Sequence, residues 1–168
     1  ITDNKNIVYR SDNLQAQKWG SGTAGQIDLQ TVWGNDEVVA LASFLNRLVI
    51  FGKRNIAIYA NPWDAGVNPS TFQLQDLIKG VGCVARDSVQ SYGDDVIFLS
   101  STGVRSLART TEKENLPLTD LTKNVKNDVN RLVPTTDADA DKVKSIYDAR
   151  GGVYILHIGH KDRTYAVD

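Results

Sequence analysis

Several kinds of residue and segment are rare or missing in this sequence, and each absence excludes a class of protein. The 168 residues include four prolines, no methionine and one cysteine, Cys83. A single cysteine excludes an internal disulfide and a zinc site built from cysteine pairs. The longest apolar run is about five residues, whereas a membrane-spanning helix needs roughly 20, so we expect no membrane-spanning segment.

The charges are balanced, because 19 lysines and arginines face 20 acidic residues for a net charge of −1. A dedicated nucleic-acid binder would usually carry a marked basic excess. With 41% hydrophobic and 23% charged residues, the composition is that of an ordinary globular protein. The chain begins at Ile1 and stops within the strand-like "TYAVD". We therefore expect residues 1–168 to be part of a longer polypeptide.

A hairpin-like pattern occurs three times along the chain. Its copies are "RLVIFGKRNIAIYA" (47–60), "DVIFLSSTGVRSL" (95–107) and, more loosely, "GVYILHIGHKDRTYAV" (152–167). The first apolar residues of the copies, Leu48, Val96 and Val153, are 48 and 57 residues apart. Another strand-like run that ends in an aromatic residue precedes each copy, at 38–44, 83–92 and 143–147. Each unit is therefore predicted to be strand, turn, strand, turn, strand.

The apolar pattern within each unit predicts where its strands lie. The second strand is continuously apolar, which is typical of a strand covered on both faces. The third alternates, as Ile56 and Ile58 do, and is expected to be peripheral with one wet face. Small antiparallel sheets that recur at such intervals are typical of β-propeller blades. We predict an all-β fold with about three propeller-like blades, too few to close a ring alone.

A helical segment is predicted at 117–133, between the second and third units. Four apolar residues in it share one stripe, namely Leu121, Val125, Val129 and Leu132. Thr119 or Asp120 can cap the start of the helix, and Pro134 ends it. We expect an amphipathic helix from about 120 to 132 that packs on the sheet through this stripe.

The sharpest candidate site is a run of alternating acids in "TTDADADKV". Asp137, Asp139 and Asp141 follow the first half of a calcium-binding loop, in which several hard oxygens surround the ion. Two positions depart from that loop, because Lys142 replaces the expected glycine and Asp148 stands where a glutamate would end it. The alternatives are a calcium site, with calcium as the only possible cofactor, and a solvated acidic loop before a strand.

Other reactive side chains, the two histidines and the paired acids, are expected to lie in turns. His157 and His160 are three residues apart, so on a strand they would point to opposite faces rather than form a metal pair. Asp94 and Asp95 are adjacent and suit a turn better than a converging acid–base pair. We therefore predict that the protein is not an enzyme, although a propeller hydrolase with converging carboxylates is an alternative.

The remaining residues of interest are the cysteine and the tryptophans. Cys83 lies in an apolar stretch and is predicted to be a buried thiol. Trp63 lies in the loop "NPWDAGVNPS", where an interface role and packing against the sheet are both open. Trp19 and Trp33 are predicted to be structural.

Three ordered segments resemble a known family. They are "VVALASFLNRLVIFGKRNIAIYA", "GVGCVARDSVQSYGDDVIFLSSTGVRSLART" and "PLTDLTKNVKNDV", and the resemblance extends from "IVYRSDNLQAQKW" at Ile7 to the end of the chain. They resemble the tail nozzle proteins of short-tailed bacteriophages, also called tail tubular protein B, to which packaged-DNA stabilisation proteins are related. The resemblance implies a propeller-containing subunit of a homo-hexameric ring. That ring would lie in the tail of the virion and would be assembled in the cytoplasm of the host bacterium.

The resemblance also implies partners and a role. The ring would contact other tail proteins, such as the adaptor and the fibres, would seal in the packaged genome, and would let double-stranded DNA pass during ejection. The near-zero net charge suits a conduit, since strong cationic contacts to phosphates would hold the DNA. We expect a neutral to acidic lumen. The alternative is a propeller binding module, either an adhesin or a calcium-stabilised scaffold.

Overall fold

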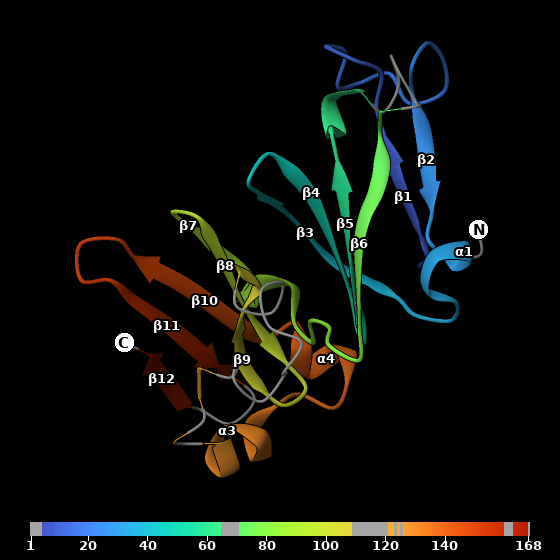
Figure 1. Cartoon of the computed structure of the whole chain (residues 1–168). Coiled ribbons are helices and arrows are strands. Elements are labelled where there is room, and N and C mark those ends of the chain that lie inside the picture. The colour runs from blue at the N-terminus through green and yellow to red at the C-terminus, as the bar shows by residue number, and fades with distance from the viewer. Residues whose placement is uncertain are drawn as a thin grey trace. The chain divides into compact units, whose positions relative to one another are not determined.

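A computed structural model describes residues 5–64, 71–108, 121–122, 124, 126–159 and 163–167. The chain divides into two compact units, Ile1–Gly80 and Val81–Asp168, which we call the N-terminal and C-terminal units (Figure 1). The fold is mainly β, with several small antiparallel sheets and a few short helices. The predicted β class is therefore confirmed, whereas no propeller is detected in the described residues.

The main sheet of the N-terminal unit has four antiparallel strands in chain order (Figure 1). They are β3 (Val38–Phe44), β4 (Arg47–Gly52), β5 (Asn55–Ala60) and β6 (Gln73–Lys79). A two-residue turn joins β3 to β4, and both Leu45 and Asn46 have positive φ, at 47° and 59°. Two positive φ values match the right-handed twist of a hairpin. The turn aligns Phe44 with Arg47 and thereby sets the register of the pair.

The expectation that the third strand of the first unit is half wet is wrong. Ile56, Ala57 and Ile58 of β5 are all buried, so both faces of this strand are covered, and β5 lies between β4 and β6 rather than at the edge of the sheet. The fourth strand, β6, was not predicted. Its sequence, "QLQDLIK", is mostly polar and exposed, so it lacks the apolar alternation by which a strand is recognised.

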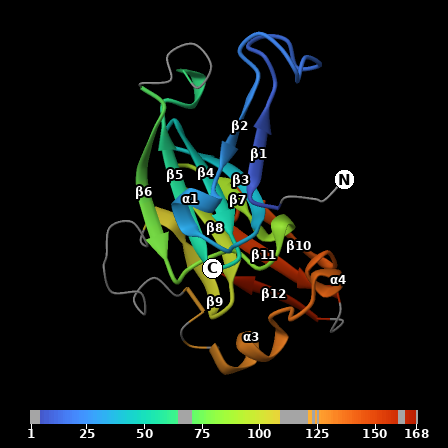
Figure 2. The same cartoon turned by 90° about the vertical axis from the view of Figure 1, so that its right-hand side faces the viewer.

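A second layer covers one face of this sheet (Figure 2). It contains the paired strands β1 (Ile7–Arg10) and β2 (Gly25–Asp28) and the short helix α1 (Gln30–Trp33). The segment "QIDLQTVW" (26–33) therefore contributes its first residues to β2 and its last four to α1. Asp28 accepts a hydrogen bond from the Gln30 N–H at 2.9 Å as the helix begins. The core of the unit contains Ile27, Leu29, Ile50, Ala57 and Tyr59, against which Trp33 packs as predicted.

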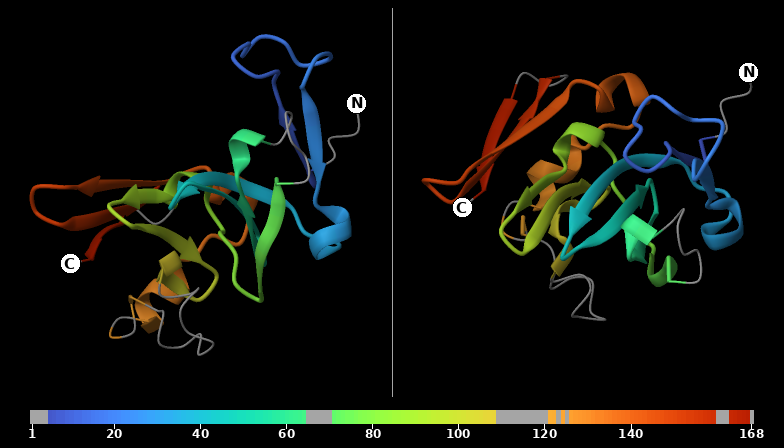
Figure 3. Two further views of the ribbon diagram at one scale, coloured as in Figure 1. Left: turned by 45° about the horizontal axis from the view of Figure 1, so that its top comes forward. Right: turned by 90° about the horizontal axis from the view of Figure 1, so that it is seen from above.

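The C-terminal unit contains two three-stranded antiparallel sheets, each in chain order (Figure 3). The first is β7 (Gln90–Tyr92), β8 (Asp95–Ser100) and β9 (Gly103–Ser106); the second is β10 (Val143–Asp148), β11 (Val153–Ile158) and β12 (Arg163–Val167). The two sheets share one apolar core, which includes Ala85, Ile97, Leu99, Val104, Val143, Tyr154, Leu156 and Ile158. The sheets are therefore packed as a pair.

The run at 83–92 forms a strand only at its end, in β7. A 3-10 helix, η2 (Arg86–Ser88), interrupts it, so the prediction of one continuous strand is wrong there. The serine explains the interruption, because the Ser88 hydroxyl donates to the Ala85 carbonyl at 2.6 Å and accepts from the Leu99 N–H at 3.0 Å. A side chain that bonds to nearby backbone competes with regular strand pairing.

The predicted amphipathic helix is present in its second half as α3 (Lys126–Leu132). Val129 and Leu132 are buried in the core of the C-terminal unit, which confirms packing through the apolar stripe. Leu121 precedes the helix, and its N–H donates to the Val104 carbonyl at 2.9 Å. Val125 and the proposed capping residues, Thr119 and Asp120, lie outside the described residues. No described helix is long and apolar enough to cross a membrane.

Candidate interaction surfaces

Polar contacts join the two sheets of the C-terminal unit where the segment from η2 to β7 meets β10 and β11, and we call this contact region the seam. The Tyr154 hydroxyl donates to the Ser88 carbonyl at 2.7 Å, and the Ser145 hydroxyl donates to the Asp87 carbonyl at 2.7 Å. The side-chain amide of Gln90 donates to both the carbonyl and the hydroxyl of Ser145, each at 3.1 Å. These contacts link the segment from η2 to β7 with β10 and β11, so the seam brings together the first strands of both sheets.

The predicted first runs of the second and third units meet at this seam. Tyr92 and Tyr147 are the aromatic residues that end the strand-like runs predicted at 83–92 and 143–147, and their ring centroids are 4.8 Å apart. Lys144 of β10 forms an ion pair with Asp87. Hydrogen bonds from Arg86 and Lys144 lower the pKa of Asp87 to about 2, so this carboxylate is charged over the whole neutral range. The seam thus combines aromatic, ionic and backbone contacts.

The thiol of Cys83 is fully buried beside this seam, as predicted. It donates to the Ala85 carbonyl at 3.1 Å and lies 3.6 Å from the Ser88 hydroxyl. Burial raises the pKa of Cys83 to about 11, although hydrogen bonds from its neighbours act in the opposite direction. A buried thiol of such high pKa is a weak nucleophile, because the thiolate is the reactive form. Cys83 is therefore a packing residue.

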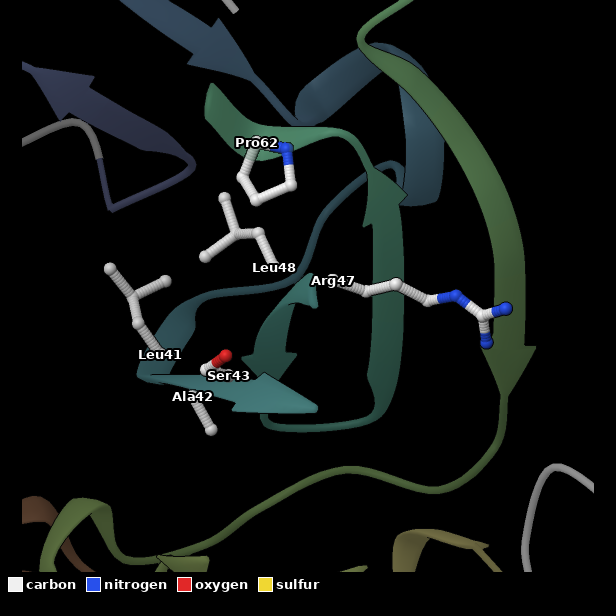
Figure 4. A pocket seen from close by; sticks show the side chains of 6 residues that line it. All are labelled: Leu41, Ala42, Ser43, Arg47, Leu48 and Pro62. Atoms are coloured by element: carbon white, nitrogen blue, oxygen red, sulfur yellow. The ribbon is translucent and has the colours of Figure 1, made fainter. Parts of the chain in front are cut away.

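An open groove of about 320 Å³ lies on the β3–β4 hairpin of the N-terminal unit, and we call it the β3–β4 groove. Figure 4 shows the side chains of Leu41 and Leu48 and the ring of Pro62 around one space, whereas the Arg47 side chain extends away from it. Ala42 and Ser43 complete the lining. The walls of the groove are therefore largely apolar.

The register of the hairpin explains why apolar side chains are exposed here. Leu41 lies opposite Ile50, and Ser43 lies opposite Leu48, so all four are on one face of the sheet. Ile50 is covered by the second layer, but Leu41 is 51% exposed. The sequence itself indicates this surface, because side chains alternate along a strand and Leu41 therefore points to the opposite face from the buried residues of β3. It was not recognised as a site during sequence analysis.

Two tryptophans are also exposed. Trp63 lies in the 3-10 helix η1 (Pro62–Asp64), next to the groove residue Pro62, and is 56% exposed. The packing alternative for Trp63 is therefore wrong, and the interface alternative stays a prediction. Trp19 is 59% exposed, so its predicted structural role is wrong as well. An exposed indole suits a contact with another molecule.

The three acids of the predicted calcium loop lie in or next to the helical turn α4 (Asp137–Ala140). Thr136 caps this turn by accepting from the Asp139 N–H at 3.2 Å, and Lys142 forms an ion pair with Asp139 at 3.2 Å. Residues two apart on a helix point in nearly opposite directions, so Asp139 diverges from Asp137 and Asp141. Among the described residues, no three His, Cys, Asp or Glu side chains are grouped to hold a metal. The calcium site stays a prediction.

The other candidate residues are separated from one another. Asp94 lies in the β7–β8 turn, as predicted. Asp95 begins β8, and its carboxylate accepts from the Val96 and Ala108 N–H groups at 2.7 and 2.8 Å. Asp95 therefore anchors the chain after β9 rather than forming an acid pair with Asp94. His157 is exposed, but it lies on the strand β11, so its predicted position in a turn is wrong; His160 lies outside the described residues.

Comparison with protein-family models and with curated proteins found no match to this chain. The family resemblance consequently rests on the ordered sequence segments in which it was noticed.

Proposed function

We propose that this chain is part of a structural subunit of a bacteriophage tail nozzle. In this proposal the repeated sheets are blades of a β-propeller in a longer tail protein, and the protein has no catalytic activity. The observation that supports it best is the docking of the β7–β9 sheet against the β10–β12 sheet. Consecutive sheets of one chain share a core there and meet along their first strands.

The docking has the features expected of neighbouring blades. A single three-stranded sheet cannot bury its apolar face alone and is stabilised by packing on the next repeat. In a propeller the blades surround a central channel, so the inner strands of neighbouring blades converge toward it. The contact between Gln90 of β7 and Ser145 of β10 fits this arrangement, in which the first strand of each unit is innermost. The β3–β6 sheet supplies a further blade of the same strand order.

The resemblance to tail nozzle proteins supplies the biological setting. Six subunits would form a ring in the virion tail, in contact with an adaptor above and with fibres at its side. The ring would retain the packaged genome and later let double-stranded DNA leave. Assembly would take place in the cytoplasm of the infected bacterium. A net charge of −1 is compatible with a lumen that does not grip phosphates.

A propeller binding module is the second candidate, and the β3–β4 groove favours it. An open, largely apolar groove is suited to a ligand or a protein segment. An adhesin or a calcium-stabilised scaffold of this kind would work as a monomer. The two candidates therefore differ first in oligomeric state and then in their dependence on calcium.

The mass of the intact polypeptide that contains this chain, measured by light scattering after gel filtration, tests the proposal. The nozzle proposal predicts a particle of six subunits at micromolar concentration. A monomer whose melting temperature rises between chelator and millimolar calcium would favour the binding module. Titration with duplex DNA at several salt concentrations tests the lumen separately. Tight, steeply salt-dependent binding would contradict a neutral to acidic lumen.

A further inference from the structure

The two sheets of the C-terminal unit differ in how many of their faces are covered. In β8, the central strand of the first sheet, residues 96–99 are all buried, at most 6% exposed. Successive residues of a strand point to opposite faces, so both faces of this sheet are covered. In β11, the central strand of the second sheet, Tyr154 and Leu156 are buried. Ile155 is partly exposed and His157 is exposed, so the described residues leave one face of the β10–β12 sheet open.

The open face is apolar at its centre. Ile146 of β10 lies directly opposite Ile155 of β11, so both side chains are on this face. Ile146 is 61% exposed. The cross-strand pairs on either side of the two isoleucines each contain a charged residue, Lys144 in one pair and Asp148 in the other. An apolar centre within a polar rim is the usual composition of a protein interface.

The first two hairpins show which faces the neighbouring sheets occupy. The β3–β4 and β7–β8 hairpins both have two-residue turns, so their second strands can be aligned from Arg47 and Asp95. Ile50, three residues after Arg47, packs against the preceding layer of β1 and β2. Ile97, two residues after Asp95, packs against the sheet that follows it in the chain. Because an offset of one residue reverses the face, the preceding and the following sheets occupy opposite faces.

Among the described residues, the β10–β12 sheet has only the first of these two contacts. Tyr154 and Leu156 share a core with the preceding β7–β9 sheet. Ile146 and Ile155 lie on the other face, which the following sheet occupies in the β7–β9 case. A repeat unit that lacks its neighbour leaves such an apolar face uncovered. Chain order therefore indicates a further sheet as the partner of this face.

We infer that the face around Ile146 and Ile155, which we call the β10–β11 outer face, is the docking surface for the next β-sheet of the longer polypeptide. That sheet presents apolar side chains to the two isoleucines, as Tyr154 and Leu156 are presented to the β7–β9 sheet. Its first strand lies beside β10, because the first strands β7 and β10 meet at the seam. The inference rests on the part of the proposed function in which these sheets are successive blades, and it adds the surface and the kind of partner.

Thiol labelling of Ile146→Cys in residues 1–168 and in the intact polypeptide tests the inference. Cys83, the only native cysteine of residues 1–168, is buried. The thiol at position 146 should react rapidly in residues 1–168 and roughly a hundredfold more slowly in the intact polypeptide, as measured by mass spectrometry of the peptide that contains it. Leu74→Cys, on the exposed strand β6, is the matched control and should react equally fast in both. Equal rates at position 146, or equal slowing at both positions, would overturn the inference.

Photocrosslinking identifies what covers the β10–β11 outer face. Benzoylphenylalanine in place of Ile146 in the intact polypeptide should form a crosslink to a segment that follows residue 168 in the same molecule. A mixture of isotope-labelled and unlabelled polypeptide distinguishes this product from a link between two copies. A link to a second copy, to a different protein or to residues 1–168 would overturn the assignment of the partner.

Ile146→Lys gives a second readout, the melting temperature. The change should leave residues 1–168 within about 2 °C of the original value, because the side chain is exposed there, and should lower the value for the intact polypeptide by about 5 °C or more. Light scattering on the labelled samples separates this inference from the nozzle proposal. A hexamer in which the thiol at position 146 reacts rapidly would overturn the inference alone, whereas a monomer with a protected thiol would contradict only the nozzle proposal.

Discussion

The hydroxyl of Tyr154 donates a hydrogen bond to the backbone carbonyl of Ser88 at 2.7 Å, across the seam between the two sheets of the C-terminal unit. Tyr154 lies on β11 and is almost completely buried, and Ser88 ends the 3-10 helix before β7. A carbonyl buried at such a place needs a partner, since an unsatisfied buried polar group is costly. The contact therefore fixes one sheet against the other at a defined point.

Substitution of Tyr154 by phenylalanine tests this contact. The ring would still fill the core, but the Ser88 carbonyl would lose its donor, so the free energy of unfolding should fall by about 1–2 kcal/mol. Urea denaturation followed by circular dichroism measures the change. Tyr147→Phe is the control, because the Tyr147 ring contacts Tyr92 but its hydroxyl forms no hydrogen bond with the described residues. Equal destabilisation by both changes would contradict a specific role for the Tyr154 hydroxyl.

The carboxylate of Asp36 organises the β4–β5 turn. It is 3% exposed and accepts from the N–H groups of Glu37, Lys53 and Arg54 and from the side-chain amide of Asn55. Asp36→Ala leaves these donors without their acceptor and should lower the free energy of unfolding by about 3 kcal/mol. Thermal or urea unfolding gives the value.

Asp76→Ala is the matched control for Asp36. Among the described residues, the carboxylate of Asp76 accepts a hydrogen bond only from the adjacent Leu77 N–H, on the exposed strand β6. Its removal should change the free energy of unfolding by no more than about 0.5 kcal/mol, as is usual at the surface. A loss at Asp36 as small as that at Asp76 would show that the turn does not depend on the buried carboxylate.

The loop between β1 and β2 should be sensitive to acid through Asp12. Its carboxylate accepts from the Thr23 side chain and backbone N–H and pairs with Lys18 at 3.3 Å. These contacts lower the pKa of Asp12 from its ordinary 3.8 to about 2, with the Thr23 side chain as the main cause. Because the folded state favours the charged form, the stabilisation is complete above pH 4 and is lost as the pH falls toward 2.

Asp12→Asn measures that contribution. The variant should melt at a lower temperature than the original chain at pH 7, and the difference should shrink steadily between pH 4 and pH 2. Thermal unfolding at several pH values gives both curves. A difference that stays constant down to pH 2 would show that the charge of Asp12 is not responsible.

Cys83 should resist thiol reagents in the folded protein. Its burial and its pKa of about 11 keep the thiolate scarce at pH 8. Reaction with Ellman's reagent should therefore be at least a hundredfold slower in buffer than in 6 M guanidinium chloride, in which the chain is unfolded. Rapid stoichiometric reaction in buffer would contradict the buried position of the thiol.

The second strands of the first two units were predictable from the sequence because burial on both faces leaves a plain apolar run, whereas the second strand of the third unit, β11, alternates between buried and partly exposed residues and is not covered on both faces. Leu48 to Phe51, Val96 to Leu99 and Val153 to Leu156 all fall within observed strands. The apolar stripe of the helical segment likewise predicted the buried residues Val129 and Leu132. In these segments local pattern and tertiary environment agree.

Elements whose environment depends on a distant partner were not predictable. β6 is polar and pairs with β5 across an intervening loop, so no local pattern marks it. Because β6 was not predicted, β5 was expected to be an edge strand of the sheet, whereas it pairs with β6 on its outer side. The exposure of Trp19 and Trp63 also depends on what covers each loop, which a single sequence does not specify.

The candidate surfaces also differ in how far the sequence predicts them. The contact of Tyr92 with Tyr147 agrees with the repeat, since each residue ends the predicted first run of its unit. The β3–β4 groove brings Pro62 next to Leu41 and Leu48 and depends on the path of the chain after β5. The acidic run at 137–141 was the strongest metal-binding motif in the sequence, yet its first residues form a capped helical turn.

Electron microscopy of the intact polypeptide that contains this chain, averaged into two-dimensional classes, tests the central claim most directly. The account predicts a ring of six subunits around an open channel, with propeller blades resolved in each subunit. Compact monomers without an axial channel would contradict the nozzle proposal.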